Sequence, residues 1–159
     1  EVSACEKGAQ WELGLSLLSK VRFAGLQANY ITTNAAISAC EAGQSWAWAL
    51  QIMQETQRLC TEHDLVTYNA VLSAFEKGLQ WGMALWHLRE LHVAGFLPDI
   101  VTFSASLYAF EKGGQWQLVL FVAEQMRQRN VGLDGIMYRT TIRACQKGGL
   151  AEHALALMS

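Results

Sequence analysis

Apolar positions recur along the chain at the spacing of amphipathic helices, in pairs of short stretches that glycine separates. In the clearest pair, the first stripe precedes Gly78 and consists of Tyr68, Val71, Leu72 and Phe75. The second stripe follows that glycine and consists of Trp81, Ala84, Leu85, Leu88 and Leu91. Steps of three and four residues place each set on one face of a helix, and a glycine after the stripe favours a helix end. The pattern therefore predicts helical hairpins.

This pattern returns with a fixed period of 35 residues. The stretch that begins at Ser73 reads SAFEKGLQW, and related stretches begin at Ser3, Ser38, Tyr108 and Arg143. A constant period of roughly 20 to 50 residues is typical of stacked repeat proteins, because one hairpin cannot bury both of its apolar stripes alone. We therefore expect an all-α fold, a right-handed α-solenoid (superhelix) of stacked helix-turn-helix repeats, with first helices on the concave face.

The period also predicts how the chain is divided. We expect one repeat array over residues 1–159, made of a partial repeat 1–29, complete repeats 30–64, 65–99 and 100–134, and a partial repeat 135–159. Because the first residue falls inside a unit, we interpret the sequence as a fragment of a longer chain. One column of the repeat is expected to lie in the core, since large aromatic rings at helical spacing usually pack there; it comprises Trp11, Trp46, Trp81 and Trp116.

Composition limits the possible classes of function. Apolar residues make up 52% of the chain, which is ample for a continuous core, and the formal net charge is -2. Such a charge provides no general attraction to nucleic acid or to acidic membranes, so any positive site must be local. No apolar run reaches the length of about 18 residues that a membrane span requires.

The cysteines and histidines provide no sign of a metal centre or an active site. Cys5, Cys40 and Cys145 share one repeat column with Phe75 and Phe110, so we interpret that column as apolar packing. Cys60 stands alone in a predicted loop, and the four histidines are scattered. We expect no metal and no cofactor, and the absence of catalytic motifs predicts that the chain is not an enzyme.

The units begin and end with a distinctive pattern. Two of them begin with Val66-Thr67-Tyr68-Asn69 and Val101-Thr102-Phe103-Ser104, and one ends with Pro98-Asp99. With the 35-residue period, this resembles the pentatricopeptide repeat (PPR) family in its P-type form, although Thr33, His63 and Arg139 depart from the usual pattern. The resemblance implies sequence-selective binding of single-stranded RNA, one base per repeat. It also implies organellar RNA processing, stability or translation in a mitochondrion or chloroplast.

Two polar columns are neither apolar nor helix-breaking, so they should face solvent or a ligand. One lies early in each first helix and comprises Asn34, Asn69, Ser104 and Arg139; the other ends each unit and comprises Asn29, Asp64, Asp99 and Asp134. The resemblance implies that these columns select RNA bases. A carboxylate only accepts hydrogen bonds, which favours the N–H of uracil or guanine. Asn leaves room for a pyrimidine and Ser for a purine, so the expected preference is U-U-G. Helix capping alone is the alternative explanation.

Two further columns have roles implied by the resemblance. An aliphatic column is expected to sandwich the bases, with packing at the unit junction as the alternative; it comprises Ile31, Val66, Val101 and Ile136. A basic column is expected to contact phosphates, although neighbouring glutamates oppose it and a solvated charged face is the alternative; it comprises Lys7, Lys77, Lys112 and Lys147.

Two other functions stay open at the level of sequence. The chain could be a helical-repeat protein-interaction scaffold, or the RNA-binding arm of a larger nuclease or editing enzyme. Periodic Asn or Ser residues followed by a terminal Asp favour RNA binding over the scaffold.

Overall fold

The computed structural model describes residues 16, 30–43, 45–58 and 64–149 of the chain. These residues form seven helices with assigned bounds and no strand, which confirms the predicted all-α helical-repeat fold. The right-handed sense of the superhelix stays a prediction. The helices are α3 (Tyr30–Ala42), α4 (Trp46–Arg58), α5 (Leu65–Lys77), α6 (Trp81–Val93), α7 (Ile100–Lys112), α8 (Trp116–Gln128) and α9 (Gly135–Gly148). Among the helices described, none has the length and apolarity to cross a membrane.

Helices of the two kinds alternate and start at the predicted interval. First helices begin at Tyr30, Leu65, Ile100 and Gly135, and second helices begin at Trp46, Trp81 and Trp116. Glycine ends the first helices as expected: the N–H of Gly78 donates to the carbonyl of Ala74, and that of Gly113 to the carbonyl of Ala109. The chain divides into two compact units, Glu1–Gly78 and Leu79–Ser159, and each is described by itself.

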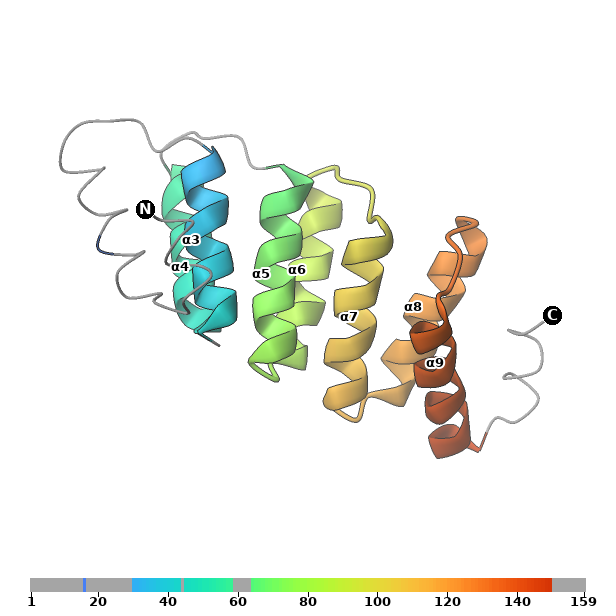
Figure 1. Cartoon of the computed structure of the whole chain (residues 1–159). Coiled ribbons are helices and arrows are strands. Elements are labelled where there is room, and N and C mark those ends of the chain that lie inside the picture. Colours follow the sequence, from blue (N-terminus) through green and yellow to red (C-terminus); the bar gives the residue numbers. More distant parts are fainter. Residues whose placement is uncertain (1–15, 17–29, 44, 59–63, 150–159) are drawn as a thin grey trace. The chain divides into compact units, whose positions relative to one another are not determined.

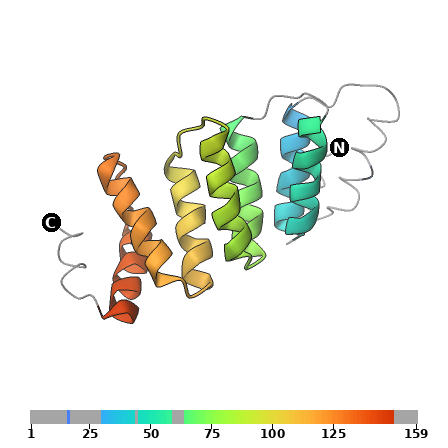
Figure 2. The same ribbon diagram turned by 180° about the vertical axis from the view of Figure 1, so that it is seen from behind.

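In the first unit, α3 and α5 form one layer and α4 lies on the other side of it (Figures 1 and 2). The first-helix stripes meet in the interior, where Ile37, Cys40, Leu72 and Phe75 are fully buried. Met53 closes this core from α4. The predicted inward faces of the first helices are therefore confirmed in this unit.

The second unit has the same two layers, with α7 and α9 on one side and α6 and α8 on the other (Figures 1 and 2). Its core is built from all four helices, and its most buried large side chains are Leu91, Leu107, Phe110, Met126 and Met137. The inward stripe of α7 is again the one that the sequence predicts.

The buried face of the second helices includes most of the predicted residues, such as Ala84, Leu88 and Leu91, but it is shifted at one column. Leu85 was expected to face inward, but it is only half-buried, as are the equivalent Leu50 and Leu120. The column two residues further along is buried instead, and it comprises Ile52, His87 and Val122. The contacts of α4 and α8 explain the additional buried column. Each of these helices packs against two first helices, so it buries a wider part of its surface than one apolar stripe. His87, only 1% exposed, thus occupies a core position.

The prediction that the Trp column lies in the core is wrong for its three described members, and Trp11 lies outside the described residues. Trp46 and Trp116 are half-buried, and Trp81 remains 37% exposed. Each of these tryptophans is the first residue of a second helix. Its ring lies against the glycine at the C-terminal end of the first helix of the following repeat. A Cβ atom added to Gly78 would lie 2.5 Å from the Trp46 ring, and one added to Gly113 would lie 2.5 Å from that of Trp81.

We call this arrangement the Trp–Gly contact, and it recurs a third time between Trp116 and Gly148, where the added Cβ would lie 2.7 Å from the ring. Real Cβ atoms do not approach a ring so closely, so the glycine provides room for the indole. Backbone freedom does not explain it, because φ is -78° at Gly78 and -76° at Gly113, values open to any residue. In the first unit, the Trp46 ring also lies beside Phe75, with centroids 6.1 Å apart.

The cysteine column serves as packing, as the sequence predicts. Cys40 and Cys145 are free and buried. Burial raises the pKa of Cys40 to about 11 and also raises that of Cys145, so both thiols stay protonated at neutral pH. Cys5 and Cys60 lie outside the described residues.

Candidate nucleic-acid interface

The column of unit-ending aspartates caps the first helices. In each case Oδ1 accepts a hydrogen bond from the backbone N–H three residues later: Asp64 from Thr67 at 2.8 Å, Asp99 from Thr102 at 2.9 Å, and Asp134 from Met137 at 2.7 Å. A carboxylate there also complements the positive end of the helix dipole. The capping role is confirmed for these three residues, and Asn29 lies outside the described residues. Because these cap bonds use one oxygen of each carboxylate, capping is compatible with recognition of a base.

The junction between α3 and α5 joins both polar columns through a threonine. The Thr67 hydroxyl lies 2.6 Å from Oδ1 of Asn34 and 2.8 Å from Oδ1 of Asp64. A hydroxyl carries one hydrogen, so it donates to one of these oxygens at a time. Thr67 thereby holds the two predicted base-selecting residues of this repeat together, and we call the trio the Asn34–Thr67–Asp64 junction.

The same junction lowers the pKa of Asp64. Partial burial raises the pKa of this carboxyl. Hydrogen bonds from the backbone and hydroxyl of Thr67 and from the Asn34 side chain lower the pKa, and together they outweigh the effect of burial. The net result is an Asp64 pKa below its ordinary value. At neutral pH this side chain is therefore an acceptor only, which suits a ligand that presents an N–H group.

The corresponding residues of the second unit are arranged differently. The Ser104 hydroxyl donates to the Ile100 carbonyl of its own helix, and Asp134 accepts from the N–H groups of Ile136 and Met137. Met137 occupies the repeat position of Thr67 and has no hydroxyl to form a link. Within the described part of this unit, no hydrogen bond joins Ser104 to Asp134.

The remaining members of the first polar column have contrasting surroundings. Asn69 is only 8% exposed, so a ligand would reach it through a narrow surface. Arg139 is exposed on α9, and its Nε donates to the Gly135 carbonyl at 3.3 Å. The column therefore presents amides, a hydroxyl and a guanidinium at equivalent helix positions.

The aliphatic column is exposed. Val66 is 60% exposed, Val101 52% and Ile136 53%, so about half of each side chain is accessible to a ligand. Each is the second residue of its first helix, close to the capping aspartate. Apolar side chains that are exposed at these three repeat positions are suited to contact a ligand. Ile31 lies in α3, with its side chain outside the described part.

The lysine column is partly neutralised. Nζ of Lys77 lies 2.7 Å from Oε1 of Glu41, and the same oxygen accepts a hydrogen bond from the Ser73 hydroxyl at 2.8 Å. Lys112 and Lys147 are exposed on α7 and α9, while Lys7 lies outside the described residues. A glutamate of the preceding first helix thus competes with any phosphate for Lys77.

Thr67 is the residue that sequence reasoning missed. It is 1% exposed, and the equivalent Thr102 is fully buried and completes a capping box with Asp99. A signal was present, because Thr32, Thr67 and Thr102 recur at the 35-residue period. A polar column beside a capping column indicates a hydrogen-bonded junction.

Metal binding receives no support from the described ranges. Across residues 30–43, 45–58 and 64–149, no group of three His, Cys, Asp or Glu side chains could hold a metal ion.

Comparison with known proteins identifies the repeat. The fold and the periodic site define a helical-repeat protein, and residues 66–96 match the model of the PPR repeat. No curated protein matches the sequence. Over 99% of its length, the chain resembles the crystal structure of the pentatricopeptide repeat protein PPR10 from maize, with 25% identity and a TM-score of 0.73. Residues 66–96 are thus identified as a pentatricopeptide repeat, and the chain shares its fold with solved pentatricopeptide repeat proteins.

Two further solved structures share the fold. One is PPR10 in complex with an 18-nt psaJ RNA element, at 19% identity, a TM-score of 0.72 and 92% coverage of this chain. The other is the PPR domain of Arabidopsis thaliana protein-only RNase P 1 in complex with tRNA, at 14% identity and a TM-score of 0.86, covering 99% of this chain and 83% of that domain. The chain spans only 22% of either PPR10 structure.

Proposed function

We propose that this chain is a sequence-selective, single-stranded RNA-binding repeat array without catalytic activity of its own. The observation that carries the proposal is the Asn34–Thr67–Asp64 junction, where an ionised acceptor lies beside the exposed Val66. This combination offers a base both an apolar contact for its face and an acceptor for its edge. Similar structures contain RNA: PPR10 with an 18-nt psaJ element, and the protein-only RNase P 1 domain with tRNA.

The proposed base choice follows from hydrogen-bonding chemistry. An ionised Asp accepts the Watson–Crick N–H of uracil or guanine and offers no donor to cytosine or adenine. Asn34 with Asp64 and Asn69 with Asp99 then select U, while the shorter Ser104 with Asp134 leaves room for G. The exposed aliphatic column sandwiches successive bases, and Lys112 and Lys147 contact phosphates.

The cellular setting is proposed from the family resemblance alone. A role in organellar RNA processing, stability or translation would place the protein in a mitochondrion or chloroplast. One solved structure of the same fold is nuclear proteinaceous RNase P 2 from A. thaliana, so this fold is not restricted to organelles.

An exchange of one acceptor tests the base readout. Asp64→Asn keeps a good helix cap but adds a donor beside Asn34, so the first selected base should change from U toward C while the other preferences persist. Binding selections from a randomised RNA pool measure the preference of both proteins. Glu41→Gln makes the same chemical change on α3, away from the base-selecting pair, and should leave all three bases unchanged.

Two results would contradict the assignment. If Asp64→Asn selected the same first base as the wild type, Asn34 and Asp64 would serve only as structural residues. If Glu41→Gln altered the preference equally, general charge rather than local recognition would determine it.

A second candidate is the RNA-binding arm of a larger nuclease. The TM-score of 0.86 to the PPR domain of protein-only RNase P 1 favours it. In that case the chain alone should bind a structured precursor RNA without cutting it, because it supplies the binding surface only. Intact RNA on a denaturing gel after binding agrees with this role, whereas cleavage products would assign catalysis to the chain itself.

A further inference from the structure

One face of α9 carries three cations, whereas the equivalent faces of the other described first helices carry at most one. Arg139, Arg143 and Lys147 are four residues apart, so they lie along one helix face with a rise of about 6 Å between neighbours. We call them the α9 basic strip. The equivalent positions are Asn34, Ser38 and Ala42 in α3, Asn69, Ser73 and Lys77 in α5, and Ser104, Tyr108 and Lys112 in α7.

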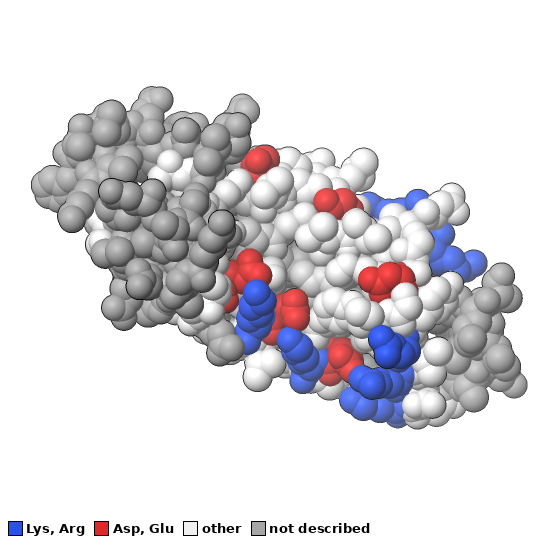
Figure 3. Space-filling model, in the orientation of Figure 1, with Lys and Arg blue, Asp and Glu red and all other residues white. Residues whose placement is uncertain are grey.

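All three cations of the strip are exposed, and α9 contains no acidic residue. Space-filling Figure 3 shows Lys and Arg side chains gathered around the position of α9. Among the residues that the structure describes, Arg139 bonds only to a carbonyl of its own helix, that of Gly135. The strip therefore concentrates positive charge on a chain whose net charge is -2.

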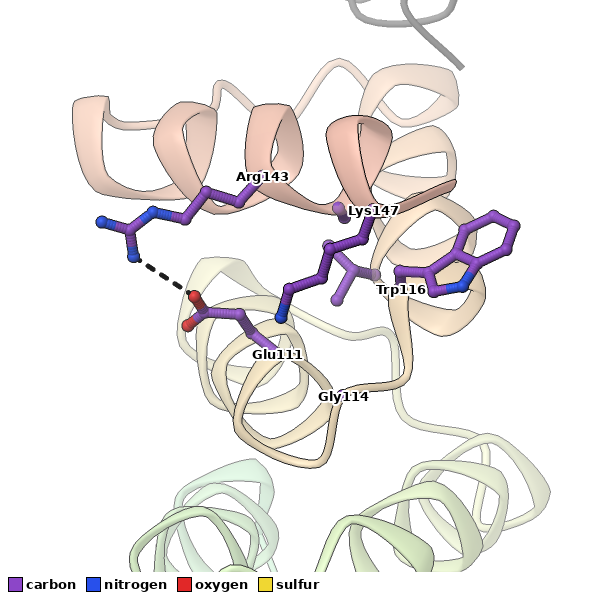
Figure 4. Close-up of a pocket in the computed structure, with 7 residues that line it drawn as sticks. Glu111, Gly114, Trp116, Arg143 and Lys147 are labelled. Carbon is purple, nitrogen blue, oxygen red and sulfur yellow. Dashed lines mark hydrogen bonds and ion pairs between the residues drawn. The ribbon is translucent and has the colours of Figure 1, made fainter. Parts of the chain in front are cut away.

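A single carboxylate faces two of these cations. Nη1 of Arg143 lies 3.4 Å from Oε1 of Glu111 on α7, and Figure 4 shows Arg143 and Lys147 both extending toward that residue. The Arg143 side chain is 65% exposed, and an exposed pair at this distance contributes little. Lys77 in the first unit differs, since it lies 2.7 Å from Glu41. A local positive charge therefore remains at Arg143 and Lys147.

We propose that the α9 basic strip binds RNA phosphates and anchors the strand without selecting a base. The proposal rests on RNA binding by the array as a whole. Guanidinium and ammonium groups bind phosphate through charge-assisted hydrogen bonds, and each neutralised phosphate releases counterions. Three cations at steps of about 6 Å along one helix, on long side chains, reach neighbouring phosphates of one strand.

Arg139 changes the chemistry at its position. Asn34 and Ser104 offer both donors and acceptors to a base edge, whereas a guanidinium offers donors alone and is always charged. Together with Arg143 and Lys147, this favours the sequence-independent backbone over the base. Recognition of guanine by Arg139 is the competing outcome, because Arg also donates to the guanine O6 and N7 atoms.

Salt dependence separates these outcomes. The whole 159-residue chain is compared with the triple variant R139Q/R143Q/K147Q, using short RNAs that contain UUG or a permuted sequence. Losing three phosphate contacts should make the log–log salt slope shallower by about 2, at about 0.7 per contact on single strands. Between 50 and 200 mM salt, the affinity of the wild type should therefore fall roughly twentyfold more than that of the variant. The triple variant should bind the UUG RNA and the permuted RNA more weakly than the wild type does, and by the same factor.

The matched control is R58Q/R89Q/R127Q, which removes the same charge from exposed positions on α4, α6 and α8. It should retain the slope of the wild type. Equal slopes for the two triple variants, or a strip variant with the wild-type slope, would overturn the inference alone. A change of the selected base in the single variant R139Q would also overturn the inference, because Arg139 would then recognise a base. Failure of the wild type to bind any RNA would instead overturn the proposed function, and the inference with it.

Discussion

The two units of the chain pack their repeats alike and join their polar residues differently. The Trp–Gly contact occurs between Trp46 and Gly78 in the first unit and between Trp81 and Gly113 in the second. At the other end of the first helices, the first unit has the Asn34–Thr67–Asp64 junction, whereas Ser104 and Asp134 in the second unit bond only to their own helices.

The difference shows where the repeats acquire individual properties. The residues at the packing end recur because each Trp ring needs a glycine at the same position of the following repeat. The capping end keeps one constant element, the aspartate, while residues around it vary from Thr67 to Met137 and from Asn34 to Ser104. Stability should therefore respond similarly to changes at the packing end of both units and unequally to changes at the capping end.

Removing the ring of Trp81 should have the largest effect. Trp81→Ala should lower the free energy of unfolding by about 3 kcal/mol, at the bottom of the range for buried aromatic residues, because the side chain is partly exposed. Trp46→Ala in the first unit should cost a similar amount. Chemical denaturation followed by circular dichroism measures both. A loss below about 1 kcal/mol in only one unit would break the equivalence of the packing ends.

Filling the glycine side of the contact should come next. Gly113→Ala should cost about 2 kcal/mol, since the new methyl group collides with the Trp81 ring and overpacking typically costs about 1–3 kcal/mol. Gly82→Ala is the matched control, because no atom lies within 4 Å of its added Cβ and alanine favours the helix. It should stabilise the protein by about 0.5–1 kcal/mol. In a Trp81→Ala background, the cost of Gly113→Ala should disappear.

Breaking the polar junction should have the smallest effect. Thr67→Val should cost about 1 kcal/mol through the lost hydroxyl bonds and should raise the pKa of Asp64 toward its ordinary value. Because the pKa of Asp64 is lower in the folded state than in the unfolded state, its ionised carboxylate stabilises the folded protein at pH values above the unfolded pKa. This contribution is lost as the pH falls through the folded pKa. The two proteins should therefore differ most at neutral pH and converge in acid.

NMR titration of the Asp64 carboxyl and denaturation at several pH values measure this effect. Ser104→Ala serves as the control in the second unit, since that hydroxyl bonds only within its own helix, and it should change stability by less than about 0.5 kcal/mol. An unchanged Asp64 pKa in Thr67→Val would show that the cap, and not the junction, sets its ionisation.

The sequence predicted the fold well because its strongest signal is periodic. The spacing of apolar residues and the glycines located the helices and identified Val71, Leu72 and Phe110 as core residues. It failed for Trp81, because the space that this ring fills is made by a glycine 32 residues later, and periodicity does not show which columns meet. In the sequence, Gly113 shows only a helix end.

The candidate site was predicted only in part. The columns of Asp64 and Val66 follow from their repetition, but neither the buried Thr67 link nor the exposure of Val66 does. Both depend on how one hairpin lies against the next. The three cations of α9 are visible in the sequence. Whether they remain available to a ligand depends on the weak pairing of Arg143 with Glu111, which only the structure shows.

The Trp–Gly contact also constrains how such a chain can change over generations. A repeat that carries both the Trp and the Gly, such as the one with Gly113 and Trp116, contributes an indole to one neighbouring repeat and accommodates the indole of the other. Any two such repeats are therefore interchangeable at that boundary. A duplication or unequal crossover that copies whole 35-residue segments preserves the fit at every new boundary. Insertion of a segment with a side chain at the glycine position does not, and arrays assembled by design should obey the same adjacency rule.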